Sequence, residues 1–345
     1  MNNKVFGSRV KRLEDPKLLR GLGLFIDDIN LPNISNAAFV RSPFPHARLK
    51  SIDKTAAEGM PGVIAVYTYA DLKPYLTAER LPVEFPGGVP NPENAGPVIM
   101  VFDETMYFGE CVAIVIAETR HIAEDASVLI DIDWEPLPAV GNCKKALEPG
   151  APLASVHTDT NLMMEMVQEY GTVDDIFKTA PHTFQEEIWQ HRGSGHPIEC
   201  RGAVGRYDPI QDVTTLWTST QMPNLVQGFI IKLMGANENQ VRVITPDVGG
   251  GFGPKFVFYS EELIIALSSK LCGRPVKWVE DRQEHFVSAV QERDQYWNAE
   301  IAVDDEGIIL GIRGSLIHDH GAYTIQGITL PYNAATCVPG PYEVP

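Results

Sequence analysis

The stretch that decides the fold of this chain is Asp247-Val248-Gly249-Gly250-Gly251-Phe252-Gly253-Pro254-Lys255. Its three consecutive glycines set backbone N–H groups side by side without Cβ atoms, and glycine reaches positive φ without strain. Such amides can form an anion-binding concavity, beside which Phe252 supplies a rigid apolar wall. The stretch fits neither the P-loop pattern, because Phe256 follows Lys255, nor the G-x-G-x-x-G pattern. From the residues alone it is either a loop built for close approach to a ligand or a glycine-rich turn between a strand and a helix.

Hydrophobic periodicity on either side of this stretch predicts an α+β chain. Apolar runs predict strands at residues 38–41, 63–68, 111–117, 130–134, 183–189, 213–217, 241–245 and 276–279. Helical spacing predicts helices at 119–129, 224–233 and 260–271, the last followed by Gly273 in the position of a C-terminal cap. Residues 298–303 and 308–318 form a predicted hairpin whose turn contains Gly307.

The predicted elements divide the chain into three parts. Residues 1–20 are rich in charge and lack an apolar period, which predicts an extended lead-in. Residues 21–145 form a first α/β unit. Residues 146–345 form a second α+β unit, which begins with a linker-like stretch that contains Pro149, Gly150 and Pro152.

Composition excludes several functional classes. The chain has 28 Lys and Arg against 45 Asp and Glu, a net charge of −17, so it has no basic stripe for nucleic acid or an anionic membrane surface. Its longest apolar run is far shorter than the roughly 20 residues of a membrane span, so we expect no membrane insertion. Five scattered cysteines without a C-x-x-C pair offer neither a disulfide framework nor a recognisable iron–sulfur ligand set. We therefore expect a cytoplasmic protein with reduced thiols. If it carries out redox chemistry, its electrons must leave through other chains.

Short blocks in a fixed order along the chain point to one family. They include Arg41-Ser42-Pro43, Tyr107-Phe108-Gly109-Glu110, Trp134-Glu135-Pro136-Leu137-Pro138, Gly195-His196-Pro197-Ile198-Glu199, Ser219-Thr220-Gln221 and Lys277-Trp278-Val279-Glu280-Asp281-Arg282. With the glycine stretch, the series resembles the large, molybdenum-binding subunits of the xanthine oxidase family, or molybdenum hydroxylases. Within that family it is most similar to the carbon monoxide dehydrogenase and aldehyde oxidase-like large subunits.

The resemblance implies a fold and a cofactor. The fold would be an N-terminal α/β hammerhead domain followed by the first part of a molybdopterin-binding α+β domain. The cofactor would be molybdopterin with molybdenum, usually as the cytosine dinucleotide in bacterial relatives. The implied activity is oxidation of an aldehyde, an N-heterocycle or carbon monoxide, with water as the oxygen source.

The resemblance also implies partners. Electrons would pass to an iron–sulfur small subunit and an FAD-binding medium subunit. The family's later blocks, including the glutamate that acts as base, would lie beyond Pro345. We therefore expect no catalytic residue within this chain, and the remaining half of the large subunit as a further partner. The alternative is a non-catalytic remnant or assembly subunit of the same fold.

Five residues form the candidate cofactor site: Gln221, Gly250, Gly251, Phe252 and Gly253. By resemblance, Gln221 approaches a ligand of the molybdenum, while Phe252 and Gly253 lie against the metal. From the residues alone, Gln221 is better explained as a turn or cap residue, because polar side chains commonly satisfy local backbone groups.

Two neighbouring residues bear on the same loop. Lys255 either neutralises a pterin phosphate or is exposed at the start of a helix. Purine-oxidising relatives have a glutamate at the position of Phe256, and a phenyl ring neither donates nor accepts hydrogen bonds. Phe256 therefore argues against xanthine as the substrate.

The remaining polar clusters predict structural roles, and we expect no metal ligand among the side chains. Pro197 separates His196 from Glu199 and disrupts a regular helix, so this pair is expected to position the pocket. His318 and His320 alternate on a predicted strand, but no third ligand is evident nearby. We interpret them as a hydrogen-bonded strand end, and Glu280-Asp281-Arg282 as an ion-pair cluster.

Overall fold

The computed structural model describes residues 6–83, 95–325 and 328–344. Its helices are α1 (Asp15–Leu18), α2 (Thr55–Glu58), α3 (Tyr69–Leu72), α4 (Arg120–Ser127), α5 (Cys143–Ala146), α6 (Val173–Thr179), α7 (Pro223–Met234), α8 (Ser260–Cys272), α9 (Arg282–Ser288) and α10 (Thr329–Thr336), with short 3-10 turns at Ile26–Asp28, Lys73–Tyr75 and Glu238–Gln240. Its strands are β1 (Ser35–Arg41), β2 (Ala47–Asp53), β3 (Val63–Thr68), β4 (Glu104–Thr105), β5 (Cys111–Ala117), β6 (Asp131–Pro136), β7 (His182–Gln190), β8 (Gly202–Asp208), β9 (Val213–Thr218), β10 (Val241–Ile244), β11 (Val276–Val279), β12 (Gln295–Val303) and β13 (Ile309–His318).

A seven-stranded sheet forms the centre of the protein, in the order β10-β9-β8-β11-β1-β5-β3. Strands β1 and β11 pair in parallel, with Ser35 opposite Val276. Strands from the first part of the chain (β1, β3, β5) and from the second part (β8–β11) therefore share one continuous sheet. Because the two parts meet through backbone hydrogen bonds, the sheet fixes their relative position.

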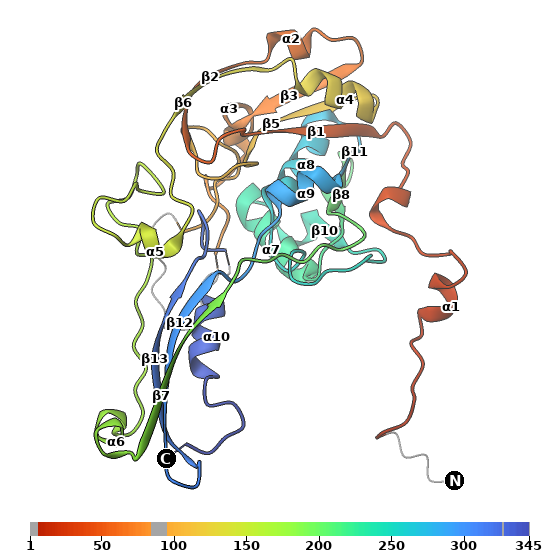
Figure 1. Cartoon of the computed structure of the whole chain (residues 1–345). Coiled ribbons are helices and arrows are strands. Elements are labelled where there is room, and N and C mark those ends of the chain that lie inside the picture. Colours follow the sequence, from red (N-terminus) through yellow and green to blue (C-terminus); the bar gives the residue numbers. More distant parts are fainter. Residues whose placement is uncertain (1–5, 84–94, 326–327, 345) are drawn as a thin grey trace, which may run out of the picture.

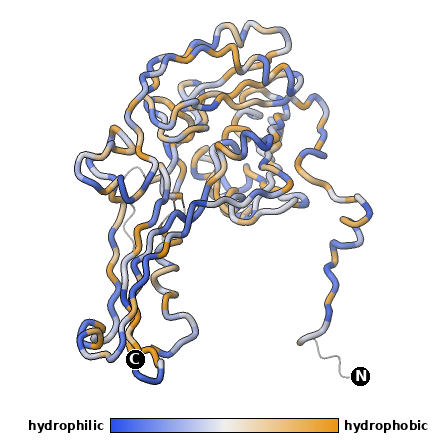
Figure 2. The backbone as a smooth tube through the Cα atoms, in the orientation of Figure 1, coloured by the Kyte–Doolittle hydropathy of each residue, from blue (hydrophilic) through white to orange (hydrophobic). Residues whose placement is uncertain are grey.

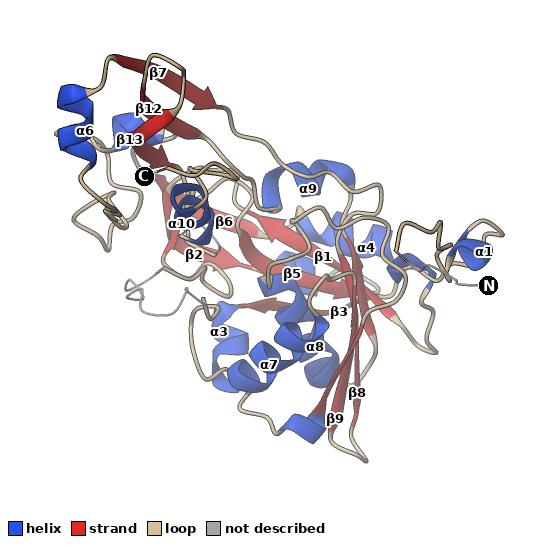
Figure 3. Ribbon diagram, turned by 90° about the horizontal axis from the view of Figure 1, so that it is seen from below, coloured by secondary structure: helices blue, strands red, loops and turns tan. Residues whose placement is uncertain are grey.

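Helices cover both faces of this sheet (Figure 3). Alternate residues of β5 pack into two separate apolar clusters. Ile114 and Ile116 lie in the cluster that also contains the apolar residues of α7 and α8. Ala113 and Val115 lie on the other face with residues of α2 and α4. The continuous apolar run of β5 is thus explained by burial on both faces, and hydrophobic stretches gather in this upper body of the molecule (Figure 2).

Helix α8 runs beneath the sheet with its residues 260–269 all buried. It approaches β8 very closely, because a Cβ added at Gly205 would lie 2.6 Å from the carbonyl oxygen of Ile265. Glycine in β8 is therefore required by packing, although glycine weakens a strand as a sequence signal. Gly273 ends α8 in the left-handed conformation with φ +62°, which confirms the predicted cap.

Two three-stranded sheets complete the fold, in the orders β4-β2-β6 and β13-β12-β7. The second contains the predicted hairpin and projects from the body (Figure 1). The N-terminal segment with α1 lies on the opposite side of the molecule in the same view. Among the described residues, no helix combines the length and apolar character needed to cross a membrane.

A buried network of charges joins β1 to the helices of the second part of the chain. Arg41 of β1 bonds Glu261 of α8 at 2.7 Å and Glu284 of α9 at 2.8 Å. Arg201 bonds Glu280 through two of its nitrogens and stacks over the ring of Tyr259 with 3.9 Å between the guanidinium carbon and the ring centre. These charged groups are buried away from water. Removing one of them therefore leaves its partner as an uncompensated buried charge.

We predict that Arg201→Met will lower the free energy of unfolding by about 3–5 kcal/mol, because it leaves the buried carboxylate of Glu280 without its arginine partner and leaves Glu261 with Arg41 alone. Urea denaturation followed by circular dichroism measures the change. Arg313→Met is the matched control, because Arg313 pairs with Glu300 and Asp174 at the surface and should not shift the midpoint measurably. Equal effects of the two substitutions would contradict a stabilising role for the buried network.

Candidate functional site

The glycine stretch forms the first half of a long loop between β10 and α8. Three of its residues have positive φ: Gly250 at +103°, Phe252 at +53° and Gly253 at +100°. Positive φ is uncommon for a bulky residue such as phenylalanine and requires support from the surroundings. The backbone of the loop thus adopts an unusual conformation over several residues, so the loop is not a simple two-residue turn.

Gln221 lies directly against this loop. It follows β9 and precedes α7, where Pro223 occupies the first turn. Its side-chain oxygen accepts a hydrogen bond from the backbone N–H of Gly253 at 3.1 Å. Its backbone N–H donates to the Lys255 carbonyl at 2.8 Å. A Cβ added at Gly251 would lie 2.5 Å from that side-chain oxygen, so only glycine permits this approach.

The structure therefore brings the five predicted site residues together. Gly250 packs under the Phe252 ring, since its added Cβ would meet a ring carbon at 2.7 Å. The side-chain oxygen of Gln221 accepts the hydrogen bond from Gly253. No hydrogen-bond partner of its side-chain amide nitrogen lies among the described residues. Apart from Gly253 and its two chain neighbours, no atom of the described residues lies within 4 Å of the Cβ position of Gly253, so the space beside that residue is open.

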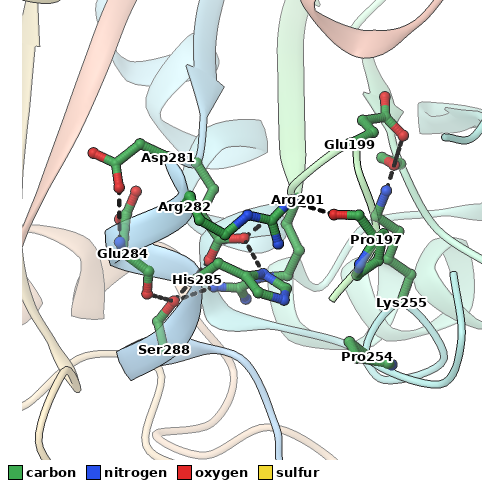
Figure 4. A network of polar contacts seen from close by, with 12 residues as sticks. Pro197, Glu199, Arg201, Pro254, Lys255, Asp281, Arg282, Glu284, His285 and Ser288 are labelled. Atoms are coloured by element: carbon green, nitrogen blue, oxygen red, sulfur yellow. Dashed lines mark hydrogen bonds and ion pairs between the residues drawn. The ribbon is translucent and has the colours of Figure 1, made fainter. Parts of the chain in front are cut away.

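Glu199 holds the loop in place from below. One of its carboxylate oxygens accepts three hydrogen bonds, from the Gly249 N–H at 2.8 Å, the Ser219 hydroxyl at 2.7 Å and the Lys255 ammonium at 2.8 Å. The other oxygen accepts from the N–H of Ile26 at 3.3 Å. Figure 4 shows the Lys255 ammonium directed at this carboxylate. The expected positioning role of Glu199 is confirmed by these contacts.

Lys255 is neither exposed nor directed at the cleft. Its side chain is buried, with 1% of the residue exposed, and burial lowers the pKa of its ammonium while Glu199 opposes that shift. Both interpretations offered by the sequence, a phosphate partner and an exposed lysine at a helix start, are therefore wrong. The residue anchors the loop, a role that local sequence does not reveal because its partner lies 56 positions away.

The site opens into a broad cleft of ≈ 2650 Å³, which is lined by Gln221, Phe252, Gly253, Phe256 and Gly195 among others. Apolar side chains that line it are accessible, with Phe252 at 75% and Phe256 at 45% exposed. Large apolar groups gathered beside a cleft indicate a surface that another molecule covers.

The N-terminal segment is tied to the same loop. Leu24 and Asp247 exchange hydrogen bonds, with the Leu24 N–H donating to the Asp247 carboxylate at 2.7 Å and the Asp247 N–H donating to the Leu24 carbonyl at 2.9 Å. Lys17 pairs with the same carboxylate at 2.5 Å. Sequence reasoning missed this connection, because nothing in the charged lead-in specifies which carboxylate it meets.

Glu110 connects the first part of the chain to the far side of the cleft. Its carboxylate accepts hydrogen bonds from the hydroxyls of Tyr323 at 2.7 Å and Thr105 at 3.0 Å, and from the N–H of Met106 at 2.7 Å. Burial raises the pKa of Glu110 to about 7, against the effect of these donors. The contact fixes the segment around Tyr323, another functionally placed group that sequence reasoning missed.

The remaining polar clusters have structural partners. His318 ends β13 and bonds Gln295 at 3.1 Å, as predicted, whereas His320 lies beyond the strand and bonds Thr324 at 3.0 Å. Two sets of described side chains bring three possible metal-ligand atoms together: Cys200, Glu280 and His285, and Cys143, Asp294 and Asp319. In both sets an arginine already neutralises the carboxylates, Arg201 in the first and Arg192 in the second.

Two family patterns match the chain in succession. The aldehyde oxidase and xanthine dehydrogenase a/b hammerhead domain matches residues 20–138. The molybdopterin cofactor-binding domain matches residues 156–345.

Individual relatives are about one third identical to the chain over the matched region. The nicotine 6-hydroxylase large subunit of Paenarthrobacter nicotinovorans is 35% identical over 100% of this chain and 42% of its own length. The carbon monoxide dehydrogenase large chain of Afipia carboxidovorans is 35% identical over 92% of this chain and 40% of its own length. The chain thus spans less than half the length of these curated relatives.

Solved structures agree in fold. Quinoline 2-oxidoreductase from Pseudomonas putida 86 superposes with a TM-score of 0.84 at 35% identity, over 92% of this chain and 40% of that one. Aldehyde oxidoreductase from Desulfovibrio gigas superposes with a TM-score of 0.86 at 23% identity, over 95% of this chain and 36% of that one, a likeness of fold alone.

We predict that Glu199→Ala will destabilise the protein by about 3–5 kcal/mol, because it leaves a buried ammonium and three further donors without an acceptor. The double variant Glu199→Ala/Lys255→Met should be more stable than Glu199→Ala alone, because it removes the unpaired charge. Urea denaturation of the four proteins in the cycle measures the coupling. Purely additive effects would show that the pair does not hold the loop.

Proposed function

This chain belongs to the large, molybdopterin-binding subunits of the xanthine oxidase family of molybdenum hydroxylases, and from that premise we propose that its loop 247–255 holds the molybdenum cofactor. The observation that carries the proposal is the contact between Gln221 and Gly253 at the mouth of the open cleft. It gathers the five candidate residues Gln221, Gly250, Gly251, Phe252 and Gly253 around a space that a ligand can enter.

The residues of the loop fit such a group. The position beside Gly253 is open to 4 Å and would be filled by any side chain, which is the arrangement expected where a backbone approaches a ligand closely. The amide nitrogen of Gln221 carries two hydrogens and can donate one across this space. When bound, the cofactor supplies the redox chemistry, and the protein supplies binding, orientation and electrostatics.

The chain's own residues have separable tasks in this proposal. Gln221 donates a hydrogen bond to the bound group, where low dielectric makes one fixed donor count for more than in water. Phe252 excludes water from one side of the site. Glu199 and Lys255 hold the loop in the conformation that presents both groups.

The whole enzyme would oxidise an aldehyde, an N-heterocycle or carbon monoxide with water as the oxygen source. Phe256 lines the same cleft and disfavours a purine, because a phenyl ring cannot meet the hydrogen-bonding edges of xanthine. The names of relatives are consistent with this, since nicotine 6-hydroxylase and carbon monoxide dehydrogenase large chains share 35% identity and a xanthine dehydrogenase molybdenum-binding subunit of Escherichia coli shares 28%.

We further propose that the chain acts in a multisubunit assembly, and that residues 21–145 and 146–345 correspond to its two domains. An iron–sulfur small subunit, an FAD-binding medium subunit and the remaining half of the large subunit would be its partners. Supporting this, the relative in Paenarthrobacter nicotinovorans named 6-hydroxypseudooxynicotine dehydrogenase complex subunit gamma is 33% identical.

The proposed cofactor form is the cytosine dinucleotide. A cytoplasmic location is consistent with five free cysteines.

We predict that Gly253→Val will sharply lower the molybdenum and pterin content of the purified assembly, because the new side chain fills the space beside the loop. Gly273→Val is the matched control. It imposes the same kind of strain at φ +62°, also in open space, but at the end of α8. Metal analysis, pterin fluorescence and melting temperature are measured together. Full cofactor content in a destabilised Gly253→Val assembly would assign the loop a purely structural role.

Gln221→Ala should reduce turnover of the complete assembly by about 10²-fold or more while cofactor content stays normal, because one preorganised donor is lost. Gln227→Ala is the control, since its side chain only bonds the Val241 carbonyl from the middle of α7. Steady-state kinetics at equal molybdenum content measure both. Unchanged turnover for Gln221→Ala would leave Gln221 as a turn residue.

A further inference from the structure

Strand β7 has an open edge. In the sheet order β13-β12-β7 it is the terminal strand, and all nine of its residues are exposed. Its pairing partner among the described residues is β12, from Gln190 opposite Gln295 to His182 opposite Val303. The other side of β7 faces outward at the margin of the projecting sheet (Figure 3). An edge of this kind offers a row of backbone N–H and C=O groups to another strand.

The sheet is amphipathic, and β7 carries the exposed part of its apolar face. The pairing register places Phe184 and Ile188 opposite Ile301 and Trp297 of β12. These two face Ile312 and Leu316 of β13, so six apolar residues lie on one side of three strands, with Glu186 of β7 between Phe184 and Ile188 on the same side. Their exposure rises toward the open edge, with Phe184 at 61% and Ile188 at 47% exposed. The face is thus least covered next to the unpaired backbone.

The opposite face of the sheet is polar and partly covered already. Gln185 and Glu187 of β7 lie opposite Glu300 and Asn298 of β12. Helix α6 packs on this side near Gly311 of β13, where α6 side chains come within 3.3 Å of the Cβ position. Apart from Trp189, which is 61% exposed and stacks on Tyr296, the exposed large apolar side chains of β7 therefore lie on the face of Phe184 and Ile188.

β7 also lacks the features that protect natural edge strands. It contains no lysine and no proline, and its sequence between His182 and Gln190 carries only two charges, Glu186 and Glu187. The other outer strand, β13, is contacted by α5, α6 and α10 instead. Long, unprotected edges with exposed apolar side chains are avoided unless another strand covers them.

The chain beyond β7 leads to the candidate site. Gly193 and Glu292 continue the pairing with two backbone hydrogen bonds, at 3.0 and 2.8 Å. Two residues later, the Cβ position of Gly195 lies 3.0 Å from the side chain of Phe252. A strand laid along β7 therefore has one end beside the cleft and the exposed residues at its rim.

We propose that β7 accepts a strand from the polypeptide that completes the large subunit, and that this strand carries its chain to the open side of the cleft. It would place alternating apolar residues over Phe184 and Ile188, with Thr, Lys or Arg beside Glu186 and Glu187. The inference rests on the proposed function only in requiring a completed large subunit, which in curated relatives is more than twice as long as the matched region.

Hydrogen exchange by mass spectrometry tests the proposal. We expect the backbone amides of residues 182–190 to exchange at least about tenfold more slowly in the purified assembly than in the chain alone. A photoreactive residue at Gln190 should form cross-links to a polypeptide that matches the large-subunit relatives outside the region aligned with this chain. Unprotected β7 amides in an intact assembly would overturn the proposal.

Paired variants separate docking from folding. Phe184→Lys/Ile188→Lys puts two charges on the apolar face, and should weaken association with the completing polypeptide by at least about tenfold. Thr183→Lys/Gln185→Lys puts the same charges on the polar face of the same strand and should leave association unchanged. Equal effects of both pairs would contradict docking on the apolar face.

Two other outcomes are equally informative. If β7 is instead protected in the chain alone, with cross-links between two β7 strands and a dimer by light scattering, the occupant is a second copy and the proposal is wrong. If β7 is protected by the completing polypeptide in an assembly that contains no molybdenum, the docking stands while the cofactor proposal fails. The two proposals are therefore judged by separate measurements.

Discussion

The ion pair between Glu199 and Lys255 is the constraint on which the candidate site depends. One carboxylate oxygen collects donors from the start of the glycine loop, from the end of β9 and from the buried lysine that closes the loop. Because the ammonium is removed from water, it cannot leave this carboxylate without a large cost in free energy. The loop is therefore held at both ends, and its positive-φ residues, including Phe252, are kept in conformations that an unsupported chain would leave. Gln221 then meets Gly253 as a consequence of that shape.

The rest of the fold forms a rigid frame that also holds the candidate site in place. The parallel pairing of β1 with β11 and the buried charges of Arg41 and Arg201 lock the first part of the chain onto the second. Glu110 and Tyr323 fix the far side of the cleft from the same body. What the frame leaves open is one side of the cleft, where Phe252 and Phe256 are exposed, and the edge of β7 that leads to it.

Much of the fold follows from local sequence, and the exceptions have physical causes. The buried strand β5, the helix α8 with its glycine cap, and the hairpin of β12 and β13 carry strong periodic or turn signals and were predictable. Strand β8 was not predictable, because its glycines are required by close packing, Gly205 against α8 and Gly202 against Ile26, and not by strand propensity. The five candidate residues could be named because of family resemblance, not periodicity. The role of Lys255 could not be predicted, because its burial depends on the carboxylate of Glu199, which only folding brings close to it.

The central claim is that the loop pinned by Glu199 is the place where the metal cofactor binds. Anomalous scattering at the molybdenum absorption edge, from crystals of the purified assembly, locates the metal directly. The account predicts one molybdenum peak per copy of this chain, in the open space beside Gly253, with its ligands within hydrogen-bonding reach of the Gln221 amide. A fully occupied molybdenum peak elsewhere in the assembly, out of contact with Gln221 and Phe252, would contradict it.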